Sequence, residues 1–449
     1  MSETKIIVLD DDPTGSQTVH SCLLLTRWDP QTLRDALEDE APLFFVLTNT
    51  RGMDAERAAA LTREVCRNLR TALDALDRAG RSIQPLMVSR SDSTLRGHYP
   101  VETDVIAEEL GPFDAHFLVP AFFEGGRVTV DSVHYIESDG KRIPTHETEF
   151  ARDSVFGYGT SFLPDYVEEK TGGRIRASDV ERFLLHEVRG DVRNRLLGLS
   201  DNLCCAVDAA EQTDLDRFTG QVLEAVAQGK RFLFRSGASL LTSLAALPPQ
   251  PVAAGDMSGY VRSDGPGAVV VGSHVRKTTA QLEALLAEPD VHPVEVDVDR
   301  VPTDRSGLLA QVLEQTRAAH REGLTPAIFT SRVERTFADQ ADRLDFGERV
   351  SGLLTDIVRG LPQDLGFLIS KGGITSNDVL SDGLSLRQSR VLGQVLPGCS
   401  VVRCPDDHPR YPGLPVVIFP GNVGDEAALA TAFRRLAGPS APSLARATG

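Results

Sequence analysis

The chain has 449 residues, of which 47 are Lys or Arg and 64 are Asp or Glu, so its formal net charge is −17. Nucleic acids and anionic membrane surfaces attract basic stripes, and this acidity argues against both kinds of partner. A small anionic substrate stays possible, because a local cluster of Arg can reverse the field inside one site. Only six of the basic residues are Lys. The length suggests two or three domains, and a hydrophobic share of 41% suffices for ordinary cores.

The sequence carries no signal for export or membrane insertion. Residues 1–10 lack a basic segment followed by an apolar one, and no stretch approaches 18 apolar residues. The six Cys form no C-x-x-C pair, and a chain of this size needs no disulfide framework. We therefore expect a cytoplasmic protein with buried or reduced thiols.

Short apolar runs alternate with longer segments of helical period in the first half of the chain. Strands are predicted at residues 5–10, 43–48, 85–89, 116–120, 203–207 and 231–235. A helix is predicted after Asp54, where Leu and Val recur at spacings of three or four, and others near 214–228 and 238–246. This alternation indicates βαβ units and a mostly parallel sheet. Residues 121–175 are rich in Gly, Thr, Tyr and charge, and we expect an insertion of loops or hairpins there.

A Pro- and Gly-rich stretch at residues 247–267 has no period and is predicted to link two domains, 1–250 and 251–449. Beyond it, strands are predicted at 268–272, 327–331, 366–370 and 415–419, and helices at 278–287, 336–359 and 425–437. The tail from Gly438 is expected to be disordered. The predicted fold is therefore α/β, with two domains that each contain a mostly parallel sheet flanked by helices.

Three polar motifs each follow a predicted strand of the first domain: DDDPTGSQTVH (10–20), TNTRGM (48–53) and SRSDSTLRGH (89–98). Residues just beyond the carboxyl ends of parallel strands line the ligand crevice of open α/β sheets, so these motifs are expected to converge. Each motif alone also fits an ordinary polar turn.

The side chains of these motifs suit a small acid that carries several hydroxyls. Three adjacent carboxylates repel one another and need a cation or a hydroxyl-rich ligand. Arg51 can fork onto a carboxylate. Arg90 and Arg96 supply donors for an anion, and Asp92 can accept from a hydroxyl. His134 and His146 show no metal-binding spacing, and no metal site is predicted.

The second domain carries SKGGITSNDV (370–379), VGSH (271–274) and FPGNVGD (419–425), each after a predicted strand. Glycines let backbone N–H groups approach phosphate oxygens, and a helix N-terminus favours an anion by roughly 0.3–1 kcal/mol. Thr375 or Ser376 is the predicted N-cap, and Lys371 would add a point charge. Ser273, Gly421 and Asn422 are further candidates for contacts to a nucleotide. The spacing matches neither the P-loop nor G-x-G-x-x-G.

The six motifs and their order resemble the four-carbon acid sugar kinase family over residues 5–436. The resemblance implies an N-terminal domain that binds threonate, erythronate or a 3-oxo relative, and a C-terminal domain that binds ATP with Mg²⁺. The γ-phosphoryl group would pass to a terminal hydroxyl. The implied substrate contacts are Asp11, Arg51, Arg90, Ser91, Asp92 and Ser93. The implied ATP contacts are Ser273, Lys371, Gly372, Gly373, Ile374 and Gly421.

This sequence departs from the family's common pattern in ways that leave the sugar acid open. Many members have Ala-Asp-Asp-Leu-Thr-Gly-Ala where Asp10, Pro13 and Ser16 stand here, and Lys where Arg90 stands. Branched or 3-oxo acids are therefore included among the expected substrates. A homodimer is the default assembly.

Phosphoryl transfer depends on positioning, charge neutralisation and a base. Our hypothesis is that Arg51 and Arg90 clamp the substrate carboxylate while Asp92 and Asp11 hold hydroxyls. Asp11 or Asp12 would accept the proton of the attacking hydroxyl.

Two other functions are open. Asp10, Asp12 and Thr14 form D-x-D-x-T after a strand, the opening pattern of haloacid-dehalogenase-type phosphatases, in which the first Asp is the nucleophile. That interpretation leaves the TLRG, SKGG and PGNVG segments without a role. A non-enzymatic protein that binds a sugar acid would need no ATP site.

Overall fold

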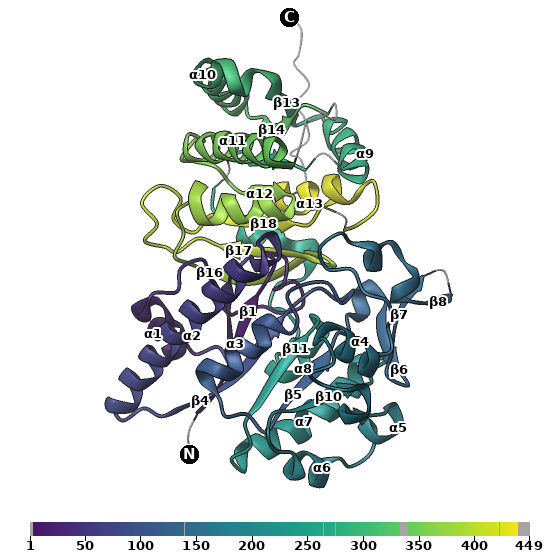
Figure 1. The fold of residues 1–449 in the computed structure, drawn as a ribbon. Coiled ribbons are helices and arrows are strands. Elements are labelled where there is room, and N and C mark those ends of the chain that lie inside the picture. Colours follow the sequence, from purple (N-terminus) through teal and green to yellow (C-terminus); the bar gives the residue numbers. More distant parts are fainter. Residues whose placement is uncertain are drawn as a thin grey trace, which may run out of the picture. The chain divides into compact units, whose positions relative to one another are not determined.

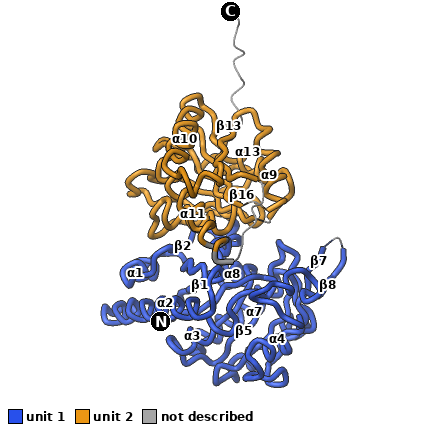
Figure 2. The backbone as a smooth tube through the Cα atoms, turned by 45° about the horizontal axis from the view of Figure 1, so that its top comes forward, with its two compact units in different colours: residues 1–249 blue, residues 250–449 orange. Residues whose placement is uncertain are grey.

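The computed structural model describes residues 3–138, 140–263, 265–273, 275–332, 340–421 and 423–438. Contacts divide the chain into two compact units, Met1–Pro249 and Gln250–Gly449 (Figure 2). Each unit has a mostly parallel sheet with helices packed on it, which confirms the predicted fold class (Figure 1).

The first unit contains eight strands in the order β2-β3-β1-β4-β11-β5-β10-β9, and every neighbouring pair is parallel. Their bounds are β1 Glu3–Asp10, β2 Leu23–Leu25, β3 Leu43–Leu47, β4 Ile83–Arg90, β5 Ala115–Val119, β9 Glu181–Phe183, β10 Leu203–Val207 and β11 Phe232–Ser236. The central strands are continuous apolar runs because helices cover both faces. The chain passes from β1 to β3 on one side and to β4 on the other, so a topological switch point lies at β1.

The helices of the first unit begin at local signals that the sequence displays. The side chain of Asp54 caps α2 by accepting from the N–H of Arg57, and Asp29 caps α1 in the same way. Val65, Leu69 and Leu76 of α2 then pack against the sheet. The bounds are α1 Pro30–Glu38, α2 Ala55–Arg78, α3 Val101–Leu110, α4 Leu163–Lys170, α5 Leu185–Val188, α6 Arg193–Gly198, α7 Gln212–Ala227 and α8 Ser239–Ala245.

The predicted insertion contains a small antiparallel sheet, β6 Arg127–Val130, β7 Val133–Ser138 and β8 Lys141–Pro144. Asp131 and Ser132 at the turn both have a left-handed backbone, which is unusual for residues with a side chain. The carboxylate of Asp208, just after β10, accepts from both of their N–H groups at 2.8 Å. A side chain of the main sheet region therefore fixes the hairpin.

The second unit has the strand order β13-β14-β12-β15-β18-β17-β16, parallel as far as β18 and antiparallel from β18 to β16. Helix α9 packs with α13, and α10 packs with α11 (Figure 1). The strand bounds are β12 Ala268–Val271, β13 Val291–Val296, β14 Thr325–Thr330, β15 Leu368–Lys371, β16 Gln388–Leu396, β17 Cys399–Arg403 and β18 Pro415–Phe419. The helix bounds are α9 Arg276–Leu286, α10 Val301–Arg321, α11 Gln340–Arg359, α12 Gly373–Asp378 and α13 Ala428–Ala437.

Several elements were missed from the sequence. The longest element that was missed is helix α10, whose apolar residues are too widely spaced among charges to form a clear stripe. The missed β16 and β17 form the antiparallel part of the second unit's sheet, and polar residues interrupt the apolar run of β16. The expected linker contains a 3₁₀ helix at Ala254–Tyr260. Residues 336–339 of a predicted helix and the tail from 439 lie outside the described residues.

All six Cys are free and buried, as expected. In the described part of the chain, no helix combines the length and apolar character that a membrane crossing requires.

Candidate functional site

Strand register aligns the polar motifs of the first unit at one edge of its sheet. Asp10 at the end of β1 is level with Leu47 on β3 and with Arg90 on β4, and Arg90 is level with Ser236 on β11. The residues that follow these strands therefore emerge side by side. The three motifs predicted to converge do so, and the end of β11 joins them.

Arg51 lies between two adjacent carboxylates. Its Nη2 is 2.5 Å from Asp11 Oδ1, and its Nη1 is 3.3 Å from Asp12 Oδ2. Asp11 is buried and also accepts from Ser91 Oγ at 3.1 Å, whereas the side chain of Asp12 is 23% exposed. Partial burial alone would raise the pKa of Asp12, but Arg51 and the hydrogen bonds from Thr14 outweigh it and lower the pKa. Asp12 is thus an accessible, ionised acceptor.

Asp10 faces the protein interior and not the open edge of the site. Its side chain is fully buried, and neither carboxyl oxygen has a hydrogen-bond partner in the described structure. A Cβ on Gly15 would lie 2.0 Å from both oxygens, so the turn closes over this carboxyl. Burial raises the pKa of Asp10 to about 8 despite Arg90 Nη1 at 3.6 Å. Asp10 is therefore poorly placed to attack a phosphate, and the buried Arg90 faces Asp10 instead of the open edge.

Asp92 is held in its ionised form by cations. Arg96 Nε donates to its Oδ2 at 2.7 Å, and Thr94 Oγ1 donates to the same oxygen. Burial opposes ionisation, but Arg51 and Arg96 outweigh it and lower the pKa of Asp92 to about 2. Arg96 in turn lies near Asp153 and over the ring of Phe150, both from the insertion.

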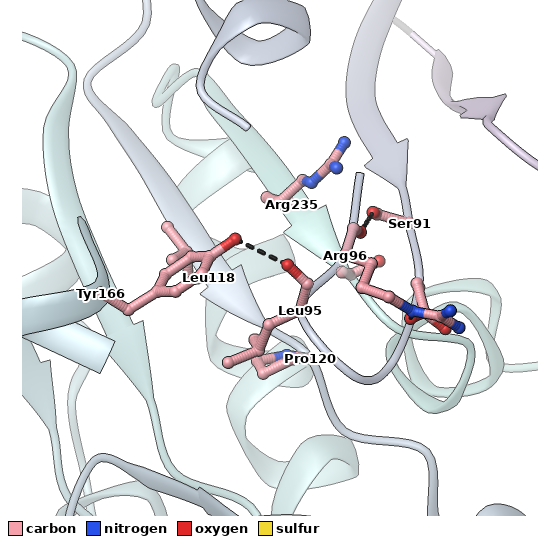
Figure 3. Close-up of a pocket in the computed structure, with 9 residues that line it drawn as sticks. Ser91, Leu95, Arg96, Leu118, Pro120, Tyr166 and Arg235 are labelled. Atoms are coloured by element: carbon pink, nitrogen blue, oxygen red, sulfur yellow. Dashed lines mark hydrogen bonds and ion pairs between the residues drawn. The ribbon is translucent and has the colours of Figure 1, made fainter. Parts of the chain in front are cut away.

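The insertion supplies three hydrogen bonds to successive carbonyls of the loop after β4. His134 Nε2 donates to Ser93 at 2.7 Å, Tyr158 Oη to Thr94 at 2.7 Å, and Tyr166 Oη to Leu95 at 2.8 Å (Figure 3 shows the last). Burial lowers the pKa of His134 to about 4, so the ring is neutral and gives its one proton to this carbonyl. Leu95 has φ of 67°, an unfavourable backbone conformation that these bonds stabilise. We refer to His134, Tyr158 and Tyr166 as the insertion clamp.

A buried ion pair below the loop was not predicted. Arg235 Nη1 contacts Glu102 Oε2, and Thr50 Oγ1 donates to the other oxygen of Glu102 at 2.5 Å. A Cβ on Gly97 would lie 2.6 Å from Arg235 Nη2 and from Ser91 Oγ, so only glycine fits there. The signal in the sequence was RSG (235–237), a fourth polar motif at the end of a strand.

In the second unit the ends of β12, β15 and β18 are also level, with Val271 beside Lys371 and Lys371 beside Phe419. The following turns meet closely. A Cβ on Gly272 would lie 2.2 Å from Thr375 Oγ1, and one on Gly372 would lie 3.2 Å from Ser273 Cβ. Thr278 Oγ1 donates to the carbonyl of Gly421 at 3.1 Å. The glycines thus let turns 272–273, 372–373 and 420–421 pack closely together, and we call this arrangement the glycine cradle.

The predicted position of the helix cap was wrong. Helix α12 begins at Gly373 with Gly372 as its N-cap, so Thr375 and Ser376 lie inside the helix. Ser376 Oγ instead donates back to the carbonyl of Ser370. Glycine replaces a side-chain cap because φ at Gly372 is 118°, a conformation that favours glycine. The side chain of Ile374 is 72% exposed.

Lys371 is buried and does not present its charge at the surface. Its Nζ donates to the carbonyls of Pro420 and Gly421 at 2.5 and 3.1 Å and lies over the ring of Phe419. Burial lowers its pKa to about 7. The structure therefore shows a lysine that holds the turn after β18.

Arg332 supports the same cradle from the end of β14. Its Nη1 donates to the carbonyl of Ser273 at 2.7 Å, and its Nη2 donates to Thr279 Oγ1 at 2.7 Å. Asn422, a candidate from the sequence, lies outside the described residues.

The glycine cradle suits a nucleotide because bare backbone and short hydroxyl side chains can approach phosphate oxygens. Within the described ranges, no group of three His, Cys, Asp or Glu side chains is arranged to hold a metal ion.

The fold and the two strand-end sites define a two-unit α/β protein with one site rich in paired charges and one glycine cradle. The Sugar-binding N-terminal domain family matches residues 6–244, and the Nucleotide-binding C-terminal domain family matches residues 268–429. The chain belongs to the four-carbon acid sugar kinase family. A D-erythronate kinase of Heliobacterium modesticaldum is 25% identical over 411 residues, which cover 87% of this chain and 80% of that protein.

Two solved structures share the fold. A protein of Salmonella typhimurium LT2 superposes with a TM-score of 0.70 at 18% identity, covering 96% of this chain and 99% of that one. A Haemophilus influenzae protein superposes with a TM-score of 0.66 at 16% identity, covering 96% and 100%.

The burial of Asp10 predicts a pH dependence of stability. The folded protein keeps the Asp10 proton up to about pH 8, whereas the unfolded chain releases it near pH 4. Its contribution to stability is complete below pH 4 and is lost as the pH rises to 8. The wild type should therefore lose unfolding free energy as the pH rises from 5 to 8, and Asp10→Asn should not. The difference in unfolding free energy between the two should shift in favour of Asp10→Asn by more than about 1 kcal/mol over this range, measured by urea unfolding. The pKa of the Asp12 carboxyl is lowered, so Asp12→Asn should show the same dependence of unfolding free energy on pH as the wild type in this range. Parallel slopes for Asp10→Asn and wild type would contradict a protonated Asp10.

The insertion clamp predicts a stability effect at Tyr158. Tyr158→Phe leaves the buried carbonyl of Thr94 without its donor, which should cost about 1–3 kcal/mol of unfolding free energy. Hydrogen exchange should also become faster in residues 93–97. The matched control is Tyr135→Phe on β7, because no hydrogen bond of the Tyr135 hydroxyl is found in the described structure. Equal effects of the two substitutions would exclude a role for the clamp.

Proposed function

We propose that this protein is an ATP-dependent kinase that phosphorylates a terminal hydroxyl of a small sugar acid in carbohydrate-acid catabolism. The substrate class is a tetronate, a 3-oxo-tetronate or a branched relative, and the expected location is the cytoplasm. The observation that carries the proposal is Arg51, which lies between Asp11 and Asp12 at the strand ends of the sugar-binding domain. The nucleotide-binding domain with its glycine cradle supports ATP as the donor.

On this proposal, the first unit binds the sugar acid with side chains that contact one another in the free protein and contact the substrate when it is bound. Arg51, 20% exposed, offers its outer edge to the substrate carboxylate, while Ser91, Asp92 and Ser93 bind hydroxyls. Arg90 lies behind the site, where its Nη1 is 3.6 Å from Asp10, and does not face the substrate directly. Asp11 orients Arg51 and Ser91, which both contact it.

Asp12 is our proposed base. It is ionised and more exposed than Asp11, so a substrate hydroxyl could reach its carboxylate and transfer a proton as the oxygen attacks. Ser273, the turn from Lys371 to Ile374, and Gly421 would hold the nucleotide. ATP supplies the phosphoryl group, and Mg²⁺ bound to its phosphates neutralises part of their charge.

Two alternatives receive less support. The phosphatase hypothesis needs Asp10 as an accessible nucleophile, but this carboxyl is fully buried behind Gly15. A protein that only binds sugar acids leaves the nucleotide-binding domain without a role.

The direct test of the kinase is a coupled ADP-release assay with tetronates, 3-oxo-tetronates and branched aldonates as acceptors. ATP-dependent turnover of at least one acid is expected. Folded protein that turns over none of them, or that releases phosphate from sugar phosphates without ATP, would refute the proposal.

Asp12→Asn should lower kcat by about 10²–10⁴-fold, the usual contribution of a positioned base. Asn keeps the oxygen that accepts from Thr14, so the turn should stay folded. Asp10→Asn is the matched control and should keep most of the activity, because the buried Asp10 is already protonated at pH 7. A near-normal kcat for Asp12→Asn with loss in Asp11→Asn would transfer the role to Asp11. Near-normal values for both would remove the base from the mechanism.

Lys371→Met removes the ammonium group that holds the carbonyls of Pro420 and Gly421. We expect the KM for ATP to rise about tenfold or more, since two buried carbonyls lose their side-chain donor. Binding of the sugar acid, measured by calorimetry without nucleotide, should be unchanged. An unchanged KM for ATP would show that this turn does not contribute to the nucleotide site.

A further inference from the structure

A small pocket opens beside the loop after β4 in the first unit (Figure 3). Its volume is about 20 Å³, enough for one water-sized group. One wall is polar and contains Ser91, Asp92, Arg96, Arg235 and Ser236. The other wall is apolar and contains Leu95, Leu118, Pro120 and Tyr166. The pocket thus adjoins Ser91, which contacts the Asp11 carboxylate.

Ser236 is the side chain of this pocket with unused hydrogen-bonding capacity. It ends β11, is 2% exposed, and its Oγ has no partner among the described residues. Its carbonyl is used, because it accepts from the N–H of Ser91 at 2.9 Å. A buried hydroxyl without a partner destabilises the protein, so a ligand that supplies the missing hydrogen bond recovers part of that cost on binding.

The other polar groups of the wall already have partners. Ser91 Oγ lies between Asp11 and the carbonyl of Arg96, and Asp92 accepts from Thr94 and Arg96. Arg235 contacts Glu102 and Ser89. A ligand hydroxyl that bonds to Ser236 Oγ would therefore displace no protein partner from it.

Backbone contacts fix the size of the pocket. A Cβ on Gly237 would lie 2.6 Å from the carbonyl oxygens of Pro120 and Ala121, so the end of β11 packs directly on the strand end beside it. Tyr166 is held by its hydrogen bond to Leu95. Because both walls are fixed, the pocket can admit a hydroxyl or hydroxymethyl group, while a carboxylate is larger and would face the apolar wall.

We propose that Ser236 is a specificity-determining residue that binds one secondary or branch hydroxyl of the sugar acid. This inference rests on the proposed kinase function and narrows its substrate class to short acids with a hydroxyl at the carbon that faces the pocket. A site that hydrogen-bonds a hydroxyl rejects the analogue that lacks it, because the protein group is then left unpaired.

The test combines two enzymes with two kinds of acceptor. The acceptors are the tetronate that wild type phosphorylates best and its 2-deoxy and 3-deoxy analogues. For wild type, one of the analogues should lose about 10–100-fold in kcat/KM. For Ser236→Ala, the difference between the parent acid and that analogue should fall below about threefold, with the KM for ATP unchanged.

Two further variants make the result interpretable. Ser236→Cys keeps the size of the side chain and weakens its hydrogen bond, so it should also reduce the discrimination if Ser236→Ala fails to fold. Ser243→Ala on α8 removes a buried hydroxyl outside the pocket and should keep the wild-type preference.

Two failures are distinguishable in this experiment. Wild type that phosphorylates no acid at all refutes the kinase proposal. Wild type that is active but does not discriminate against either analogue, or a Ser236→Ala enzyme that discriminates as wild type does, overturns the role of Ser236 and leaves the kinase intact.

Discussion

The arrangement of the first site depends on one interaction, the contact of Arg51 with two adjacent carboxylates. Asp11 and Asp12 directly follow a buried strand, where like charges repel and burial disfavours ionisation. A single guanidinium relieves both costs because it reaches Asp11 and Asp12 at 2.5 and 3.3 Å. With Asp12 ionised and exposed, the edge of the sheet can receive a proton. Without Arg51, burial would raise the pKa of Asp12, as it raises the pKa of Asp10.

Parallel strand register then extends this interaction into a site. The ends of β1, β3, β4 and β11 are level, so side chains that are far apart in the sequence meet without long connections. The insertion adds precision, because its clamp fixes three successive carbonyls of the loop that carries Ser93. Preorganisation of this kind favours selective binding, since the loop need not be ordered by the substrate.

The sequence allowed the strand ends to be predicted because each motif directly follows an apolar run. It did not show which acid faces inward. Asp10 is buried only because Gly15 folds back over it, and that contact is a property of the turn. The roles of His134 and Arg235 depend on partners 41 and 133 residues away, which no local pattern encodes. Helix α10 was missed for another reason, because its apolar residues are sparse.

The acidic chain uses two different solutions for anions. In the second unit, two cations near the cradle are turned inward: Lys371 and Arg332 donate to backbone carbonyls and support the turns. Backbone N–H groups donate to the phosphates of any polyphosphate in much the same way. They favour polyphosphates as a class and discriminate little among them.

In the first unit, the side chains already form hydrogen bonds and ion pairs with one another. A substrate must place its own polar groups where they can take over these interactions. Discrimination among sugar acids is therefore expected to reside in the first unit. The place to look for it is a group that has no partner until the substrate arrives, because a missing hydroxyl costs most where the protein has no alternative hydrogen bond. In this chain Ser236 meets that condition, and the strand end that carries it lies beside the acids proposed to act in the reaction.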